Sequence, residues 1–136
     1  MYSGKKILVT ASIIVLIGIS VAATAPSPEK SDYKNLKVLP KNISTKKLQQ
    51  IMIDEFEDGL GVSCGFCHAE QKGSHKLDYA SDDKPEKEIA RNMMRMTNKF
   101  NSKYFQVRHA MIGDSVSVVT CETCHRGQPR PEGVDK

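Results

Sequence analysis

The chain has 136 residues and a formal net charge of +4, and two of its 20 basic side chains, Lys5 and Lys6, belong to an N-terminal leader. The remaining chain is close to charge balance, which excludes the strongly basic surface of a nucleic-acid-binding protein. It has the size of one domain, and with no Trp, three Tyr and four Phe it offers only a thin apolar core of its own.

Residues 1–25 have the features of an export signal or a membrane anchor. Lys5 and Lys6 precede an apolar run over residues 7–21, and the small residues 22–25 follow as a cleavage zone. Residues 7–25 carry no charge and come close to the roughly 20 residues that span a bilayer. We therefore expect a periplasmic domain, either soluble or tethered to the inner membrane by its N-terminal segment.

Residues 26–34 are a polar, proline-bearing linker, and residues 35–136 are expected to form the folded domain. Ser44 predicts the N-cap of a helix that runs to about Asp58, with apolar residues three to four positions apart. Met52 lies on that apolar stripe, so it is either a core methionine or a ligand for a metal bound just after the helix.

Two pentads follow the pattern Cys-x-x-Cys-His, at residues 64–68 and 121–125, and they contain all four cysteines of the chain. This pattern attaches c-type haem. The two thiols add to the vinyl groups of a porphyrin, and the adjacent His68 or His125 becomes the proximal ligand of the iron. The sequence therefore predicts two covalently bound haem c groups, held by the residues Cys64, Cys67, His68, Cys121, Cys124 and His125. Two buried porphyrins would also supply the missing apolar surface.

Three other interpretations of the pentads are weaker. A four-cysteine zinc site requires a shorter gap between the pairs and gives no reason for the two histidines. A pair of disulfides is compatible with export but leaves the histidines unexplained as well. A thioredoxin-like motif requires a βαβ pattern that the sequence lacks.

Residues 69–83 are polar and predict a surface loop, after which a second helix is expected from the N-cap Asp83 to about Asn101. Its apolar stripe contains Met93 and Met96, whereas Met94 is turned roughly 100° away. The stripe consists of Ile89, Met93, Met96 and Phe100. This periodicity favours Met93 or Met96 as a ligand of the second iron.

Residues 104–120 carry no clear periodicity, and they contain His109 and Met111 as alternative ligands for the second iron. The second pentad follows directly, and an irregular tail ends the chain. The expected fold is therefore all-α: a small haem-cored domain of two helix-plus-pentad units with irregular loops, after the N-terminal signal or anchor helix.

Three stretches carry a resemblance to a known family: residues 60–68, residues 90–97 with Asn101, and residues 119–129, which end in Cys-His-Arg-Gly-Gln-Pro. They resemble the cytochrome subunit of photosynthetic reaction centres, a multihaem c-type cytochrome built from such units. The resemblance implies Met52 as the sixth ligand of the first haem and Met96 as that of the second. The full family member has four haems, and this chain has two pentads, so the resemblance implies the electron-carrier role alone.

The resulting expectation is a periplasm-facing dihaem cytochrome that carries single electrons, with both irons six-coordinate through His and Met. Such a protein is not an enzyme, and its partners are redox proteins, including a membrane respiratory complex. The alternative is a haem enzyme or sensor, peroxidase-like or gas-binding, in which one iron is open.

Overall fold

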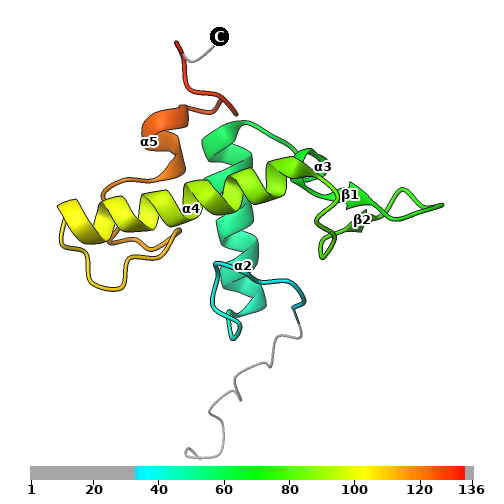
Figure 1. Cartoon of the computed structure of the whole chain (residues 1–136), viewed down its shortest axis with the longest axis horizontal. Helices are drawn as coiled ribbons and strands as arrows, with labels where there is room; N and C mark the ends of the chain where they lie inside the picture. The colour runs from blue at the N-terminus through cyan, green and yellow to red at the C-terminus, as the bar shows by residue number, and fades with distance from the viewer. Residues whose placement is uncertain (1–32, 134–136) are drawn as a thin grey trace, which may run out of the picture.

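The computed structural model describes residues 33–133, and the expected leader and most of the expected linker lie outside this range. Figure 1 shows two helical segments that cross, one made of α2 (Thr45–Ile51) with η1 (Met52–Asp58), the other α4 (Pro85–Tyr104). The pentads form the short helices α3 (Cys64–Cys67) and α5 (Cys121–His125). Each pentad therefore follows a longer helix, as the sequence predicted.

The first long segment begins where the sequence predicted and changes its winding halfway along. Ser44 has extended backbone angles and its hydroxyl accepts a hydrogen bond from the Lys47 backbone N–H at 3.3 Å, which caps α2. From Met52 the hydrogen bonds widen to the π pattern of η1, which ends at Asp58 before Gly59. Such π turns occur preferentially at functional sites, and this one begins at a candidate iron ligand.

The segment expected to be a surface loop contains a short β-ladder. Strands β1 (Ala69–Glu70) and β2 (Leu77–Asp78) pair antiparallel, with Ala69 opposite Asp78. The fold is therefore mainly helical rather than all-α. Strands of two residues are too short to produce a detectable alternation in the sequence.

Helix α4 differs from its prediction at both ends and in the face that it buries. Its N-cap is Lys84 rather than Asp83, Pro85 is its first residue, and it continues past Asn101 to Tyr104. The predicted apolar stripe is largely exposed. The side of α4 that faces the interior consists instead of Arg91, Met94, Thr97 and Asn101.

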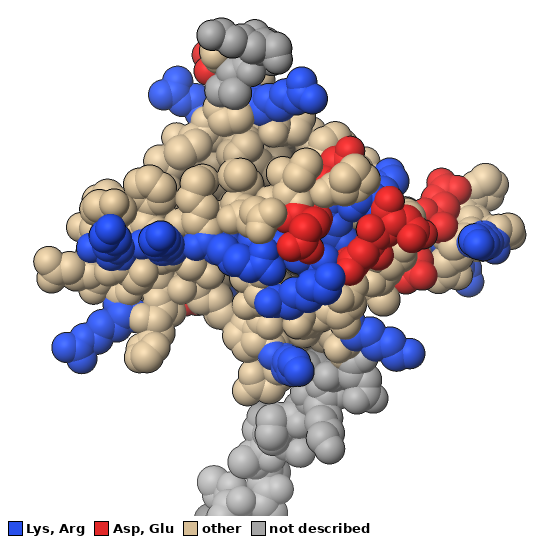
Figure 2. All heavy atoms as spheres, viewed as in Figure 1, with Lys and Arg blue, Asp and Glu red and all other residues tan. Residues whose placement is uncertain are grey.

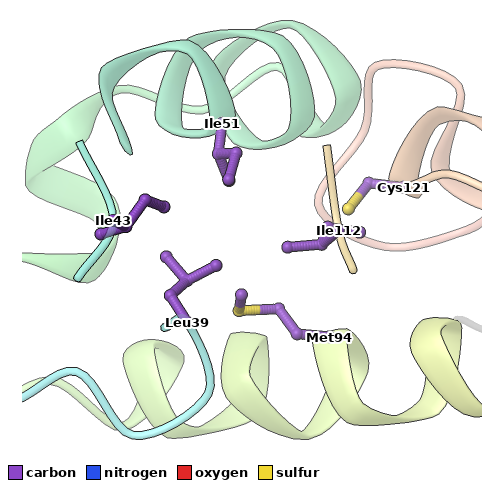
Figure 3. Packing of buried hydrophobic residues seen from close by; sticks show 6 residues of the cluster. All are labelled: Leu39, Ile43, Ile51, Met94, Ile112 and Cys121. Atoms are coloured by element: carbon purple, nitrogen blue, oxygen red, sulfur yellow. The ribbon is translucent and has the colours of Figure 1, made fainter. Parts of the chain in front are cut away.

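The core lies between the two crossing segments and is small. Its six buried apolar residues are Leu39, Ile43, Ile51, Met94, Ile112 and Cys121, and Figure 3 shows their side chains directed toward a common interior. Ile51 and Ile112 are almost completely buried. Cys121, part of the second pentad, therefore belongs to the core itself.

Residues 105–120 form turns and bends rather than strands, and Asn101 fixes their end. Its side-chain oxygen accepts the N–H groups of Val118 at 2.8 Å and Val119 at 2.9 Å, and its amide donates to the Val119 carbonyl at 2.7 Å. Asn101 is 1% exposed. A single buried side chain thus positions the backbone that leads into the second pentad.

Within residues 33–133, no helix has both the length and the apolar character that crossing a membrane requires. The segment that the sequence nominates for this role, residues 7–25, lies outside the described part of the chain.

Candidate haem-binding sites

The first pentad is wound into a single helical turn. Ser63 is the N-cap of α3, and His68 follows the turn in an extended conformation, with its N–H donating to the Cys64 carbonyl at 3.1 Å. Cys64 is exposed and Cys67 is half-buried, and burial is the main reason why the pKa of the Cys67 thiol is raised. Both thiols therefore lie on one helical turn, and the histidine directly follows that turn.

A largely apolar hollow of about 850 Å³, part of it open to solvent, lies against this pentad. Cys64, Cys67 and His68 line it together with residues of η1, α4 and the loops around them. The apolar side chains among them are Leu36, Val38, Leu39, Met52, Phe56, Val62 and Met94. Its apolar lining beside two thiols and an imidazole is chemically suited to a porphyrin.

His68 is prepared for metal binding. Its Nδ1 atom is buried and has no hydrogen-bond partner within the described residues, and its ring packs edge-on against Tyr79 at 5.0 Å between centroids. Burial, with Lys87 and Arg91 nearby, lowers the pKa of His68, which favours the neutral imidazole. A neutral imidazole is the form that binds a metal ion.

Two methionines line the same hollow as His68. Met52 is half-buried at the first position of η1, and Met94 is 5% exposed on the inner face of α4. Met52 is the residue that the sequence nominated for the first iron. Met94 was set aside because it lies off the apolar stripe, yet it also reaches this hollow.

The wall of the first hollow carries an ion-pair cluster centred on Asp82. Arg91 Nη1 contacts Asp82 Oδ1 at 2.8 Å, Lys37 Nζ contacts Asp82 Oδ2 at 2.7 Å, and Lys87 Nζ lies 3.6 Å away. These cations, above all that of Lys37, hold the pKa of Asp82 well below its usual range. Figure 2 shows the acidic and basic side chains interleaved over the N-terminal half of α4. The cluster therefore connects helix α4 to the residues that precede α2.

The second pentad is also a helical turn, and it packs against η1. Thr120 and Thr123 form a capping box at the start of α5. The buried carboxylate of Glu55 accepts the Cys121 N–H at 3.1 Å, and a Cβ on Gly59 would contact the Cys121 side chain. Burial and the Glu55 charge raise the pKa of Cys121 to about 12. The first pentad, by contrast, contacts α4 through Lys84, which donates to the Gly65 carbonyl.

His125 is oriented by the chain that follows it. Its Nδ1 atom lies 2.9 Å from the Gln128 carbonyl oxygen, so Nδ1 carries the proton and Nε2 is left free for a metal. Arg126 adopts a left-handed conformation, which turns the chain back toward the ring. A hollow of about 630 Å³ lies beside the ring, lined mostly by polar residues, with Cys124 among them. The donor set of two thiols and an oriented imidazole suits a haem here as well.

The candidate sixth ligands of the second iron do not line the hollow beside His125. Met93 and Met96 lie on the outer face of α4, 38% and 44% exposed, beside the exposed side chains of Ile89 and Phe100. His109 is exposed with φ of 52°, and Met111 is half-buried. The outer face of α4 is thus an apolar stripe that carries two thioether sulfurs.

Glu55, which contacts the second pentad, is a residue that the sequence analysis did not single out. It follows the buried Ile51 by four positions, and so falls on the inner face of the first helical segment. The four-residue spacing from Ile51 could therefore have indicated an inward position for Glu55. A carboxylate in a helix is usually solvated, however, so the spacing alone did not predict its burial.

The cysteines form neither of the weaker alternatives, a shared zinc site or disulfides, within the described residues. All four cysteines are free thiols. In the described part of the chain, no three side chains of His, Cys, Asp or Glu are grouped so that they could share a metal ion. The two pentads act as separate units.

Comparison with known proteins identifies relatives. The family described as photosynthetic reaction centre cytochrome C subunit matches residues 7–135. The subunit of that name from Rubrivivax gelatinosus is 37% identical over 52% of this chain, and that from Thermochromatium tepidum is 31% identical over 82%. Cytochrome c-554 from Chloroflexus aurantiacus is 30% identical over 70% of this chain. No solved structure matches the chain significantly.

The matched regions cover only a part of these relatives. The chain spans 16% of the Rubrivivax protein, 20% of the Chloroflexus protein and 25% of the Thermochromatium protein. The similarity therefore covers one segment of each larger protein.

Proposed function

The chain belongs to the photosynthetic reaction centre cytochrome c subunit family, and we propose that it is a dihaem c-type cytochrome that carries single electrons between redox partners. The observation that carries the proposal is the pair of pentads, each wound into one helical turn with its own hollow. Neither pentad shares its thiols with the other.

The residues of each pentad have distinct tasks. Cys64 with Cys67, and Cys121 with Cys124, would hold one porphyrin each through thioether bonds. His68 and His125 would bind the irons. When bound, each haem supplies a one-electron couple. The chain orients His125 through the Gln128 carbonyl and places His68 in a hollow lined mainly by apolar side chains.

Met52 and Met96 are proposed as the sixth ligands. Met52 lines the hollow that contains His68, which supports its role at the first iron. Met96 lies on the exposed apolar face of α4, and the family resemblance is what supports its role at the second iron. Two closed irons leave no coordination position for a substrate, and the protein then acts as a carrier rather than an enzyme.

A haem enzyme or sensor with one open iron is the second candidate. It is favoured by one observation: the hollow beside His125 is lined by no methionine. Met93, Met111 and His109 are the other residues available to close this iron, and peroxidase-like or gas-binding chemistry would require that none of them does.

The N-terminal segment is the basis for the proposed location of the protein. We propose that residues 1–25 serve as a signal peptide or an anchor, residues 26–34 as a linker, and residues 35–136 as the haem domain on the periplasmic side. The partners would be redox proteins, including a membrane respiratory complex.

The visible spectrum of the holoprotein, made in a host that matures c-type haem, tests this function. The reduced protein with and without carbon monoxide is compared. Covalent haem with a methionine-to-iron charge-transfer band and no response to carbon monoxide is the expected result. Binding of carbon monoxide at one iron would instead support the enzyme or sensor.

A further inference from the structure

We propose that the C-terminal end of α4 is the docking surface for a redox protein whose contact face is acidic. This surface, called the α4 end patch, consists of Lys99, Lys103, Tyr104 and Phe105. The inference rests on the proposed function. It deepens that function by naming where a partner docks and which charge the partner's surface carries.

The stretch of chain that contains the α4 end patch is basic throughout. Residues 89–113 contain no Asp or Glu, and they contain five basic residues, Arg91, Arg95, Lys99, Lys103 and Arg108. The first two are paired with Glu88, at 2.8 and 3.2 Å. The other three are exposed and form no ion pair within residues 33–133. Figure 2 shows basic side chains along the C-terminal half of α4, whereas acidic ones gather toward its N-terminal end. The C-terminal end of the helix therefore presents positive charge that the protein itself does not neutralise.

Two exposed aromatic side chains lie beside these cations. Tyr104 is 61% exposed and Phe105 is 48% exposed. The Tyr104 ring lies 5.4 Å from that of Phe100, and the Lys103 ammonium lies 5.2 Å from the centre of the Tyr104 ring. Aromatic side chains with a charged rim are typical of protein interfaces, and those of redox encounters are small. The end of one helix is therefore enough surface for such a partner.

The α4 end patch lies close to the residues proposed for the second haem. Lys99 follows Met96, the proposed sixth ligand of the second iron, by three positions on the same helix. The Asn101 carbonyl accepts the Val107 N–H at 3.1 Å, which holds the chain where it leaves α4. The Asn101 side chain accepts the N–H groups of residues 118 and 119, which lead into the second pentad. A protein bound at the patch would therefore lie beside the second haem site.

A redox protein suits this surface better than a lipid bilayer does, although anionic headgroups would also attract the cations. Electrons pass between proteins only when their redox groups approach closely, and the patch meets this need because it adjoins Met96. Binding to a bilayer gives no reason for that position. In the docked pair, one electron passes between the redox group of the partner and a haem iron, which changes between the ferric and ferrous states. No bond forms or breaks, and no proton is transferred.

Stopped-flow reduction of the oxidised holoprotein tests the proposal. The donor is fully reduced flavodoxin, an acidic protein that gives up one electron without transferring a proton. The site variant combines Lys99→Gln with Lys103→Gln, which removes two exposed charges and leaves the proposed iron ligands unchanged. We expect its second-order rate constant at low salt to be about tenfold below that of the wild type, because electrostatic steering raises association rates by at least that factor. The difference should shrink as added salt screens the charges.

Two controls separate docking from other effects. Lys46→Gln combined with Lys72→Gln removes the same number of charges from exposed lysines on α2 and in the turn between β1 and β2, and it should slow the reaction clearly less. Hexaammineruthenium(II) is a small cationic one-electron donor that gains nothing from the lysines. The site variant should therefore react with it at least as fast as the wild type does.

Three results would overturn the proposal: equal slowing of the site and control variants, no slowing in either, or slower reduction of the site variant by both donors. Sedimentation with vesicles of phosphatidylglycerol and phosphatidylcholine tests the bilayer. Loss of vesicle binding by the site variant, with an unchanged flavodoxin rate, would assign the α4 end patch to a membrane instead. Failure of the proposed function is distinguishable, because the intact mass would show a chain without two attached haems before any kinetic measurement.

Discussion

Gly61 and Gly127 lie in direct backbone contact, and this contact joins the residues before the first pentad to those after the second. A Cβ atom on Gly61 would overlap the carbonyl oxygen of Gly127. The Gly127 N–H also donates to the Gly59 carbonyl at 3.1 Å. Cys64 and Cys121 are 57 positions apart in the chain, and this backbone contact, together with the Glu55 carboxylate on the Cys121 N–H, brings the residues that flank the two pentads together.

The first prediction concerns this contact. Gly61 has φ of +64°, so Gly61→Ala would both strain the backbone and force it away from Gly127. Gly73→Ala is the matched control, because Gly73 has φ of +74° but open space around it. We expect Gly73→Ala to cost about 1–2 kcal/mol in free energy of unfolding and Gly61→Ala clearly more, as measured by urea denaturation. Equal losses would contradict the contact.

The second prediction concerns the pH dependence of stability. The cations around Asp82, led by Lys37, lower its pKa in the folded state, so its stabilising effect is complete above the pKa of an unfolded Asp. It is lost as the pH falls below about 4 and through the lower folded-state pKa. We expect the melting temperature of the wild type to fall more steeply on acidification from pH 5 than that of Asp82→Asn.

Asp83→Asn is the control for this measurement. It removes the same charge one position away, and Asp83 forms no ion pair within residues 33–133. Its acid response should match that of the wild type. An acid response of Asp82→Asn as steep as the wild type's would show that the cluster does not contribute.

The third prediction separates the two methionines of the first hollow. Met52→Leu keeps the volume of the side chain, so its cost in stability should stay below about 1.5 kcal/mol. If Met52 is the ligand, this variant opens the first iron, and the reduced protein binds carbon monoxide. Met94→Leu is the matched control in the same hollow, and in this variant the first iron should keep its sixth ligand and bind no carbon monoxide. Carbon monoxide binding by Met94→Leu alone would transfer the ligand role to Met94.

The fourth prediction concerns the backbone segment that leads into the second pentad. Asn101→Ala would remove the partner of the Val118 and Val119 backbone groups. We expect a loss of at least about 2 kcal/mol in free energy of unfolding, since each buried group left unsatisfied costs about 1–3 kcal/mol. Haem should also be attached less completely at Cys121 and Cys124, as seen in the intact mass. Asn98→Ala, one turn away and half-buried, should change neither quantity.

The first helix, the pentads and the order of elements could be predicted because their signals are local. Ser44 is a cap residue at the right distance from an apolar stripe, and Pro85 marks the first turn of α4. The pentads have a fixed spacing that chemistry requires. None of these inferences depends on which segments meet in space.

The buried face of α4 could not be predicted from periodicity, because its polar members are satisfied by distant residues. Arg91 is paired with Asp82 and the Asn35 carbonyl, and Asn101 with residues 118–119. Only these long-range partners make it favourable to bury them and leave the apolar stripe outside. The same holds for Glu55, whose partner is a backbone N–H 66 positions away. The stripe that remained outside carries Met96, the proposed sixth ligand of the second iron.

The intact mass of the exported, purified protein tests the central claim most directly. The measurement is made under denaturing conditions, after expression with a c-type haem maturation system, so that only covalent groups are counted. The account predicts the mass of the chain plus two haems. A chain with one haem or none, or one carrying disulfides in their place, would contradict it.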